Sequence, residues 1–274
     1  MAVPTTFDQT VTDYSLPHAY WLARASDLAY KDDATVEQQA HDWGFPTVRH
    51  HDTAFTPPFP LQDTQAYTAA SDRMIITAFR GTEPKEIRDW LTDGTTPPWP
   101  GPAATGYVHY GFAEALNSVF PTVRDTIAEL RTNGQTLWFT GHSLGGALAM
   151  LAAARLYLED PKLRADGVVT FGQPRTCDRL LADAYNRGFQ NRTYRFVNNN
   201  DIVPQLPPEP AFTHVDVMRW IDSSGQIRDN GPGVVGGLTN RAKGLAADAF
   251  SPTGEGIRDH LLRNYLAAIE KNLA

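Results

Sequence analysis

The chain has 274 residues, of which 42% are hydrophobic and 20% are charged. This length supports one substantial core or two small ones, and this composition excludes a wholly disordered chain. The formal net charge of −7 argues against a nucleic-acid partner, because such partners usually bind a basic face. A single cysteine, Cys177, excludes an intramolecular disulfide bond.

The N-terminal stretch MAVPTTFDQTVTDYSLPHAY has neither a basic start nor an apolar run, so it does not read as a secretory signal. No stretch reaches the roughly 20 apolar residues that span a bilayer, and we expect no transmembrane segment. The sequence leaves the location open between the cytoplasm and secretion without a recognisable signal peptide.

We expect one α/β domain over residues 1–274, because no repeat or linker is visible. Strands and helices are expected to alternate along it. Apolar spacing predicts helices around 22–29, 36–43, 112–130, 147–158, 179–185 and 257–269. Short apolar runs predict strands at 67–70, 74–79, 136–140, 168–171, 194–197 and 215–221. This alternation predicts a mostly parallel sheet covered by helices on both faces, with functional residues at the carboxyl ends of the strands.

The segment GHSLG, residues 141–145, matches the pattern G-x-S-x-G between a predicted strand and a predicted helix. A serine at such a sharp turn lies in strained dihedral angles and presents its hydroxyl away from the sheet. Glycines two residues to either side keep Cβ atoms out of the turn. Ser143 is therefore the candidate nucleophile. The alternative is a plain Gly-rich connection.

A serine nucleophile needs a histidine that accepts its proton and an acid that orients the histidine, and in this arrangement the chain order is Ser, Asp or Glu, His. Only His214 and His260 follow Ser143 in the sequence. We favour His260, where a Gly-rich stretch meets the last predicted helix, and expect a structural role for His214. Asp201, after the predicted strand 194–197, is the favoured acid. Its rivals are Asp178, Asp216, Asp222 and Asp259.

Several motifs together resemble the class 3 lipase family, the fungal-lipase-like branch of the α/β-hydrolases. They agree in order and spacing over most of residues 60–265. The matching motifs are FRGT (79–82), RDWLTD (88–93), VHYGF (108–112), TGHSLGG (140–146), FGQPR (171–175), NNDIVP (199–204) with LPP (206–208), and DH (259–260).

The resemblance implies an α/β-hydrolase fold and independently selects Ser143, Asp201 and His260 as the catalytic residues. It further implies an oxyanion hole formed by Thr82 and by the backbone N–H of Leu144.

A lid is also implied, at about residues 83–105. Its apolar residues Ile87, Trp90 and Leu91 would contact substrate, unless this segment is a surface loop whose Trp90 packs on the core. Trp99 would wall an acyl groove or merely stiffen the loop. His109 is expected to pack behind the site.

The function that this reading predicts is a serine carboxylester hydrolase, a triacylglycerol lipase or esterase that works through an acyl-enzyme. Phospholipase A1, a feruloyl-type esterase and a polyester hydrolase use the same machinery and remain alternatives, as do a protease or amidase and a catalytically silent lipid-binding module. The expected partner is an acyl-ester lipid, and a lipid–water interface is one setting in which it would be met. No cofactor is expected, and no metal site is expected because metal-ligand spacing is lacking.

Overall fold

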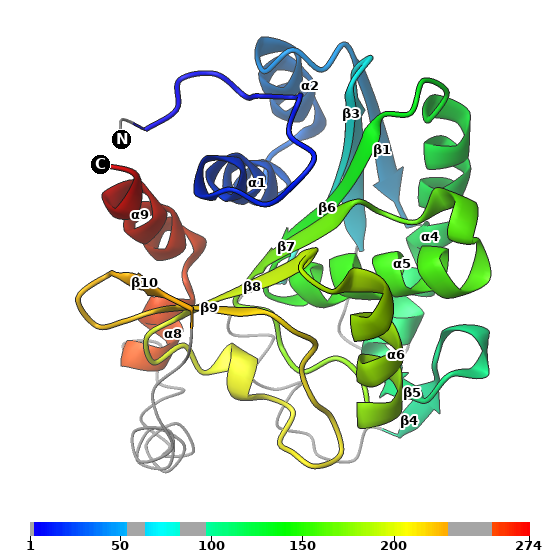
Figure 1. Ribbon diagram of the computed structural model, residues 1–274, viewed down its shortest axis with the longest axis vertical. Coiled ribbons are helices and arrows are strands. Elements are labelled where there is room, and N and C mark those ends of the chain that lie inside the picture. The colour runs from blue at the N-terminus through cyan, green and yellow to red at the C-terminus, as the bar shows by residue number, and fades with distance from the viewer. Residues whose placement is uncertain (1–2, 54–63, 83–96, 230–253) are drawn as a thin grey trace.

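A central sheet of eight strands organises the described part of the protein (Figure 1). The computed structural model describes residues 3–53, 64–82, 97–229 and 254–274. In spatial order the strands are β1 (Thr47–Asp52), β2 (Gln65–Ala70), β3 (Met74–Phe79), β6 (Thr136–His142), β7 (Gly167–Phe171), β8 (Thr193–Asn198), β9 (Met218–Ile221) and β10 (Ile227–Arg228). Strands β3 to β9 are parallel neighbours, and antiparallel pairs form the two ends of the sheet.

The register of the parallel strands brings their carboxyl ends to one edge. Phe79 at the end of β3 pairs with Gly141 of β6, and His142 pairs with Phe171 at the end of β7. The residues that directly follow these three strands are therefore close in space, although they are far apart in the sequence.

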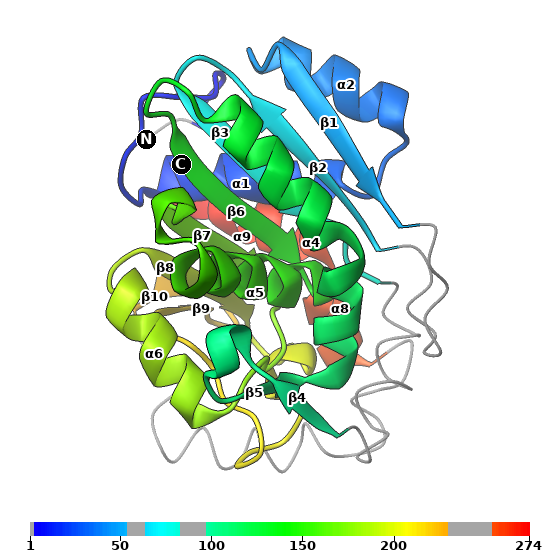
Figure 2. The same cartoon turned by 90° about the vertical axis from the view of Figure 1, so that its right-hand side faces the viewer.

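Helices cover both faces of the sheet, as the sequence predicts. One face carries α1 (Leu16–Leu28) and α9 (Leu262–Leu273), and the other carries α4 (Tyr110–Leu130), α5 (Leu144–Glu159) and α6 (Arg179–Phe189) (Figures 1 and 2). Ser15 caps α1 by accepting a hydrogen bond from the backbone N–H of His18. A shorter helix, α2 (Asp33–Asp42), is closed by Trp43 and followed by Gly44, whose φ of 86° suits glycine. No helix in the described ranges is both long enough and apolar enough to cross a membrane.

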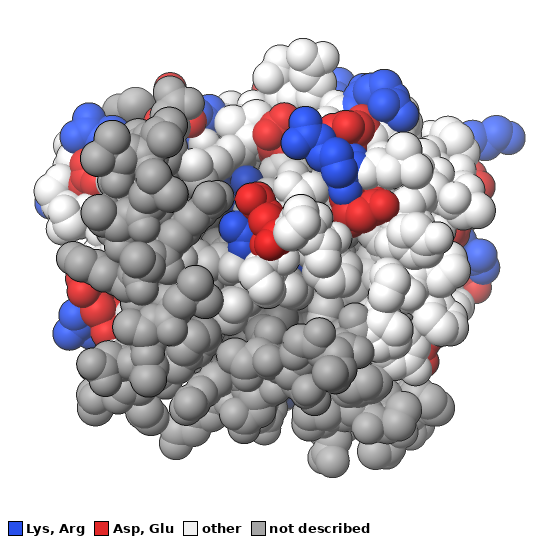
Figure 3. All heavy atoms as spheres, turned by 90° about the horizontal axis from the view of Figure 1, so that it is seen from below, with Lys and Arg blue, Asp and Glu red and all other residues white. Residues whose placement is uncertain are grey.

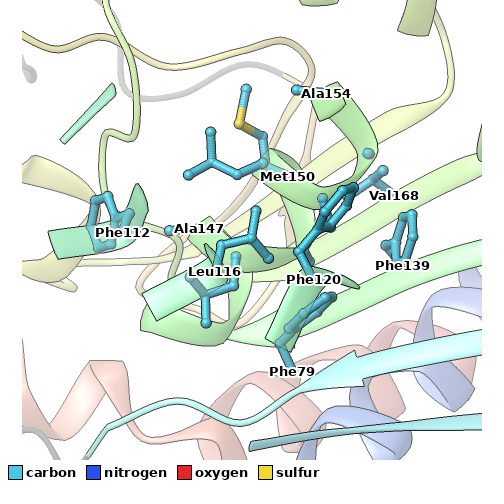
Figure 4. Packing of buried hydrophobic residues seen from close by; sticks show 14 of the residues in the cluster. Phe79, Phe112, Leu116, Phe120, Phe139, Ala147, Met150, Ala154 and Val168 are labelled. Carbon is cyan, nitrogen blue, oxygen red and sulfur yellow. The ribbon is translucent and has the colours of Figure 1, made fainter. Parts of the chain in front are cut away.

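The larger core lies between the sheet and the α4–α5 layer. Helix α5 is buried along almost its whole length, because its sequence is apolar on all sides. Figure 4 shows Ala147, Met150 and Ala154 of α5 packed among aromatic side chains from α4 and the sheet, including Phe120 and Phe139. A continuous apolar layer therefore fixes the helix that begins directly after Ser143.

A second core lies on the face that carries α1 and α9. Phe7 stacks on Trp21 with ring centroids 5.2 Å apart and contacts Phe45 edge-on. His18 belongs to the same aromatic cluster, with its ring 4.3 Å from that of Trp138. Neither ring nitrogen of His18 has a hydrogen-bond partner among the described residues, and burial lowers the pKa of His18 to about 4.

Two expected elements need correction, and some strands were not predicted. The helix predicted over 257–269 is two helices, α8 (Glu255–His260) and α9, because the backbone of Leu261 is extended (ψ 127°). The strand predicted over 215–221 is shorter, since only Met218–Ile221 form β9. Strand β1 was missed, because its sequence TVRHHD carries little apolar alternation. The small antiparallel pair β4 (Pro98–Pro100) and β5 (Tyr107–His109) was also missed, because each strand is only three residues long and β4 begins and ends with proline.

We expect the free energy of unfolding to fall as the pH is lowered from 7 to 5, partly through His18. The unfolded chain binds a proton on His18 near the ordinary pKa of 6.5, whereas the folded chain does so only near 4. The contribution of His18 to the free energy of unfolding is therefore fully present above pH 6.5 and is lost as the pH falls toward 4. At pH 5 this loss is on the order of 2 kcal/mol. Urea denaturation at several pH values measures this dependence.

His18→Leu should flatten that pH dependence. His41→Leu, which removes an exposed histidine of α2, should leave it unchanged. Equal pH dependence in the wild type and in His18→Leu would contradict the assignment.

Candidate active site

Ser143 occupies the turn between β6 and α5. The backbone of Ser143 is strained, with φ 59° and ψ −127°, and its side chain is fully buried. The turn is sterically possible only because glycines flank it. A Cβ atom on Gly141 would lie 2.2 Å from the carbonyl of Gly145, and one on Gly145 would lie 2.1 Å from the carbonyl oxygen of Phe79. The local sequence thus forces the Ser143 hydroxyl to the carboxyl edge of the sheet.

His260 and Asp201 form a buried pair beside this edge. His260 is the last residue of α8, and Asp201 follows β8. The His260 Nδ1 atom lies 3.0 and 2.9 Å from the two carboxylate oxygens of Asp201. The Asp201 carboxylate accepts this hydrogen bond, so the proton is on His260 Nδ1. In the neutral ring, Nε2 then keeps a lone pair.

Two further donors hold the Asp201 carboxylate. The backbone N–H of Val203 donates to Oδ1 at 2.9 Å, and the hydroxyl of Tyr265 in α9 donates to Oδ2. Burial, with the neighbouring charge of Asp201, raises the pKa of Tyr265 well above 10, so the hydroxyl stays protonated. The same hydroxyl accepts a hydrogen bond from the backbone N–H of Asn198. These contacts fix the acid from several elements at once.

His142 holds His260 from the opposite side. Its Nε2 donates to the backbone oxygen of His260 at 2.7 Å, and its Nδ1 lies 2.9 Å from the hydroxyl of Tyr30. The carbonyl oxygen can only accept, so the neutral His142 ring carries its proton on Nε2 and Tyr30 donates to Nδ1. Burial, with the neighbouring His260, lowers the pKa of His142 well below 6.5, which keeps this ring neutral.

Gly172, the residue after β7, lies against the His260–Asp201 pair. Its φ of 61° favours glycine, and a Cβ atom here would lie 2.9 Å from both Asp201 Oδ2 and His260 Nδ1. The Ser143 Oγ and His260 Nε2 atoms are both buried and make no hydrogen bond with described residues. A candidate nucleophile and a candidate base therefore each have a polar atom that no described residue occupies.

Thr82 and Leu144, the candidate oxyanion donors, lie at the same edge. Gly81 precedes Thr82, and a Cβ atom on Gly81 would lie 3.3 Å from that of Ser143. Leu144 is the first residue of α5, and the N–H groups of a first helical turn have no partner within the helix. This position also favours negative charge through the helix dipole.

The rival residues lie elsewhere or have other partners. Asp178 caps α6 by accepting from the N–H of Leu181, and Asp259 accepts from Asn199 and Asn200. Asp216 contacts Asn186, and Asp222 accepts hydrogen bonds within the turn that follows β9. His214 is bound through Nε2 to the carbonyl oxygen of Pro204. His109 packs between the rings of Phe112 and Phe212.

The substrate-contact candidates Ile87, Trp90 and Leu91 lie outside the described residues, as does most of the lid candidate at 83–105. Its last part forms β4 and the 3₁₀ turn Pro102–Ala104. Trp99 lies in β4, is 41% exposed and contacts the Tyr110 ring at 5.2 Å. Within the described ranges, no group of three or more His, Cys, Asp or Glu side chains is arranged to hold a metal ion.

Comparison with known proteins agrees with this fold and edge. The family model "Lipase (class 3)" matches residues 76–211. A lipase of Rhizomucor miehei is 36% identical over 186 residues, which are 64% of this chain and 48% of that protein. A triacylglycerol lipase of Arabidopsis thaliana is 31% identical over 250 residues, covering 73% of this chain and 48% of that protein.

The structure of the Rhizomucor miehei lipase–propeptide complex is similar with a TM-score of 0.62 and 28% identity, over 88% of this chain and 77% of that one. The fold is thus that of an α/β-hydrolase, with a serine elbow at the carboxyl edge of its sheet. More narrowly, the chain belongs to the class 3 lipase family. It spans about half the length of the curated relatives that it matches.

Sequence reasoning missed several residues around the pair. Tyr265 lies within the helix predicted around 257–269, but nothing in the sequence indicated that its hydroxyl contacts Asp201. Tyr30 and His142 were not considered as partners of each other, and 112 residues separate them. The one available signal was the histidine within GHSLG, because a histidine beside a buried turn needs hydrogen-bond partners.

Tyr265→Phe should lower the free energy of unfolding by about 2–3 kcal/mol. The substitution removes a hydrogen bond to a buried charged group and leaves the N–H of Asn198 unpaired. Urea denaturation at pH 7 gives the difference. Tyr194→Phe, which loses only one hydrogen bond to a backbone oxygen, is the matched control and should cost about 1 kcal/mol. Equal costs for the two variants would contradict a special role for the Tyr265 hydroxyl.

Proposed function

We propose that the protein is a carboxylic ester hydrolase of the lipase type, with Ser143, His260 and Asp201 as its catalytic triad. The observation that carries this proposal is the buried His260–Asp201 hydrogen bond at the edge where the strained Ser143 turn lies. Relatives named lipase and triacylglycerol lipase support the same reaction class.

In the proposed reaction, Ser143 Oγ attacks the ester carbonyl carbon while His260 Nε2 accepts the hydroxyl proton. The backbone N–H groups of Thr82 and Leu144 would bind the oxygen that becomes negative, and losing one such donor can cost about 3 kcal/mol. His260 then gives its proton to the leaving alcohol, and the acyl group stays on Ser143. Water, deprotonated by His260, attacks this acyl-enzyme and releases the carboxylic acid and the free serine.

Asp201 would orient His260 and stabilise its positive charge during both steps. Its burial and its three donors support this role, because a fixed carboxylate needs little reorganisation when the charge appears. His142 would hold the His260 backbone and take no proton itself, since burial keeps it neutral.

Among esters, we propose acylglycerols as substrates. On the described part of the side seen from below, Lys and Arg lie beside Asp and Glu, and charges of the two signs are mixed (Figure 3). A relative named triacylglycerol lipase supports the choice of acylglycerols. Tributyrin and a phospholipid, compared at equal acyl concentration, test this choice, and faster release from the phospholipid would contradict it.

Ser143→Ala should reduce kcat on p-nitrophenyl butyrate by at least about 1,000-fold, because the nucleophile is lost. Hydrolysis is followed by absorbance, and circular dichroism checks that the variant is folded. Ser26→Ala, which removes another fully buried serine, is the control and should retain activity. Undiminished turnover by folded Ser143→Ala would refute the mechanism.

Gly172→Ala should reduce kcat by about 100-fold or more, because its methyl group would push His260 away from Asp201. Gly134 offers a matched control, since its φ is 70° but a Cβ atom there meets nothing within 4 Å. Gly134→Ala should cost about 1 kcal/mol of stability and leave kcat unchanged. If both variants retain full activity, a methyl group at position 172 does not disturb the His260–Asp201 pair, and the prediction is wrong.

A further inference from the structure

Asp259, the residue before His260, is joined to three consecutive asparagines that precede Asp201. Its backbone oxygen accepts from Asn198 Nδ2 at 2.9 Å. Its carboxylate Oδ2 accepts from Asn199 Nδ2 at 3.0 Å and from the backbone N–H of Asn200 at 3.2 Å. These contacts connect the turn after β8 directly to α8.

This connection matters because α8 is only six residues long. A helix of this length is not stable by itself, so its position depends on what it contacts. Asn200 adjoins Asp201 in the sequence, and Asp259 adjoins His260. The hydrogen bond between Asn200 and Asp259 therefore ties the two chain segments together one residue away from the His260–Asp201 pair.

The carboxylate of Asp259 does not serve as the acid of the pair. Both oxygens of Asp201 lie within hydrogen-bond distance of His260 Nδ1, whereas the Asp259 carboxylate accepts from the asparagines. The side chain is half-buried, and burial, with the charges of Glu255 and Asp201 nearby, raises its pKa. Keeping the Asp259 carboxylate charged in these surroundings costs free energy. Its hydrogen bonds to Asn199 and Asn200 offset that cost.

The turn is also shaped for this contact. Asn199 has φ 42°, a left-handed conformation that asparagine tolerates better than most residues. Its side-chain amide reaches Asp259 and, at 3.4 Å, the Glu255 carboxylate one helical turn earlier. Glu255 is exposed and makes the longer contact, so Asp259 is the better-placed acceptor.

We propose that Asp259 is a positioning residue that fixes His260 against Asp201 by clamping α8 to the Asn198–Asn200 turn. It touches neither substrate nor the reacting atoms. Its effect on turnover rests on the proposed ester hydrolysis, but its effect on the His260–Asp201 hydrogen bond does not.

Asp259→Ala should lower kcat by about 10-fold to 100-fold with little change in KM, because His260 is misplaced while substrate binding is kept. Asp259→Asn, which keeps one acceptor oxygen, should retain more activity than Asp259→Ala. Asp222→Ala is the matched control, because Asp222 also accepts backbone hydrogen bonds in a turn, from Ser224 and Gln226. Its kcat should equal that of the wild type. Equal loss of kcat in Asp222→Ala and Asp259→Ala would show a general structural effect and overturn the proposal.

A second measurement does not depend on activity. The proton between His260 Nδ1 and Asp201 should give a downfield proton NMR signal, assigned by its loss in His260→Gln. This signal should shift or broaden in Asp259→Ala and stay unchanged in Asp222→Ala. An unchanged signal in Asp259→Ala overturns the proposal. If the wild type hydrolyses no ester, the proposed function fails, and the NMR comparison alone decides the role of Asp259.

Discussion

The described part of the structure depends on one buried carboxylate, that of Asp201. An ionised carboxylate out of contact with water is costly unless every oxygen receives hydrogen bonds. Here the donors come from the backbone of Val203, from His260 at the end of α8 and from Tyr265 in α9. Satisfying Asp201 thus requires the C-terminal helices to dock against the loop after β8, and the docking that stabilises the fold also assembles the candidate site.

The nucleophile depends on a second constraint, the shared edge of parallel strands. The ends of β3, β6 and β7 are aligned by their register, so three chain turns must fit into one small volume. Glycine resolves this crowding at the turns around Ser143, at Gly81 and at Gly172, where a Cβ atom would contact a neighbouring turn or the His260 ring. Strain at Ser143 is sustained because α5 is held by the core behind it.

The sequence carries enough information to predict a mostly parallel α/β sheet and to place Ser143 and Asp201 at strand ends, because apolar runs and turn residues mark local structure. The α/β-hydrolase fold follows from the resemblance of its motifs to the class 3 lipase family. It does not carry the contacts between distant segments. The apolar spacing of the last predicted helix continues across Leu261, where the extended backbone separates α8 from α9. Likewise, Tyr265 has a helical spacing that indicates burial, but nothing local indicates which partner its hydroxyl meets.

The neighbouring histidines His142 and His260 show how contacts between distant segments make two identical side chains differ. Their rings lie 4.5 Å apart, so a charge on one disfavours a charge on the other. His142 is bound at both nitrogens, by Tyr30 and by the backbone of His260, in an arrangement that suits only the neutral ring. His260 instead donates from Nδ1 to the Asp201 carboxylate, and its Nε2 atom has no hydrogen-bond partner among the described residues. Two identical side chains therefore make different contacts, and in the proposed reaction His260 Nε2, which has no partner among the described residues, accepts the Ser143 proton.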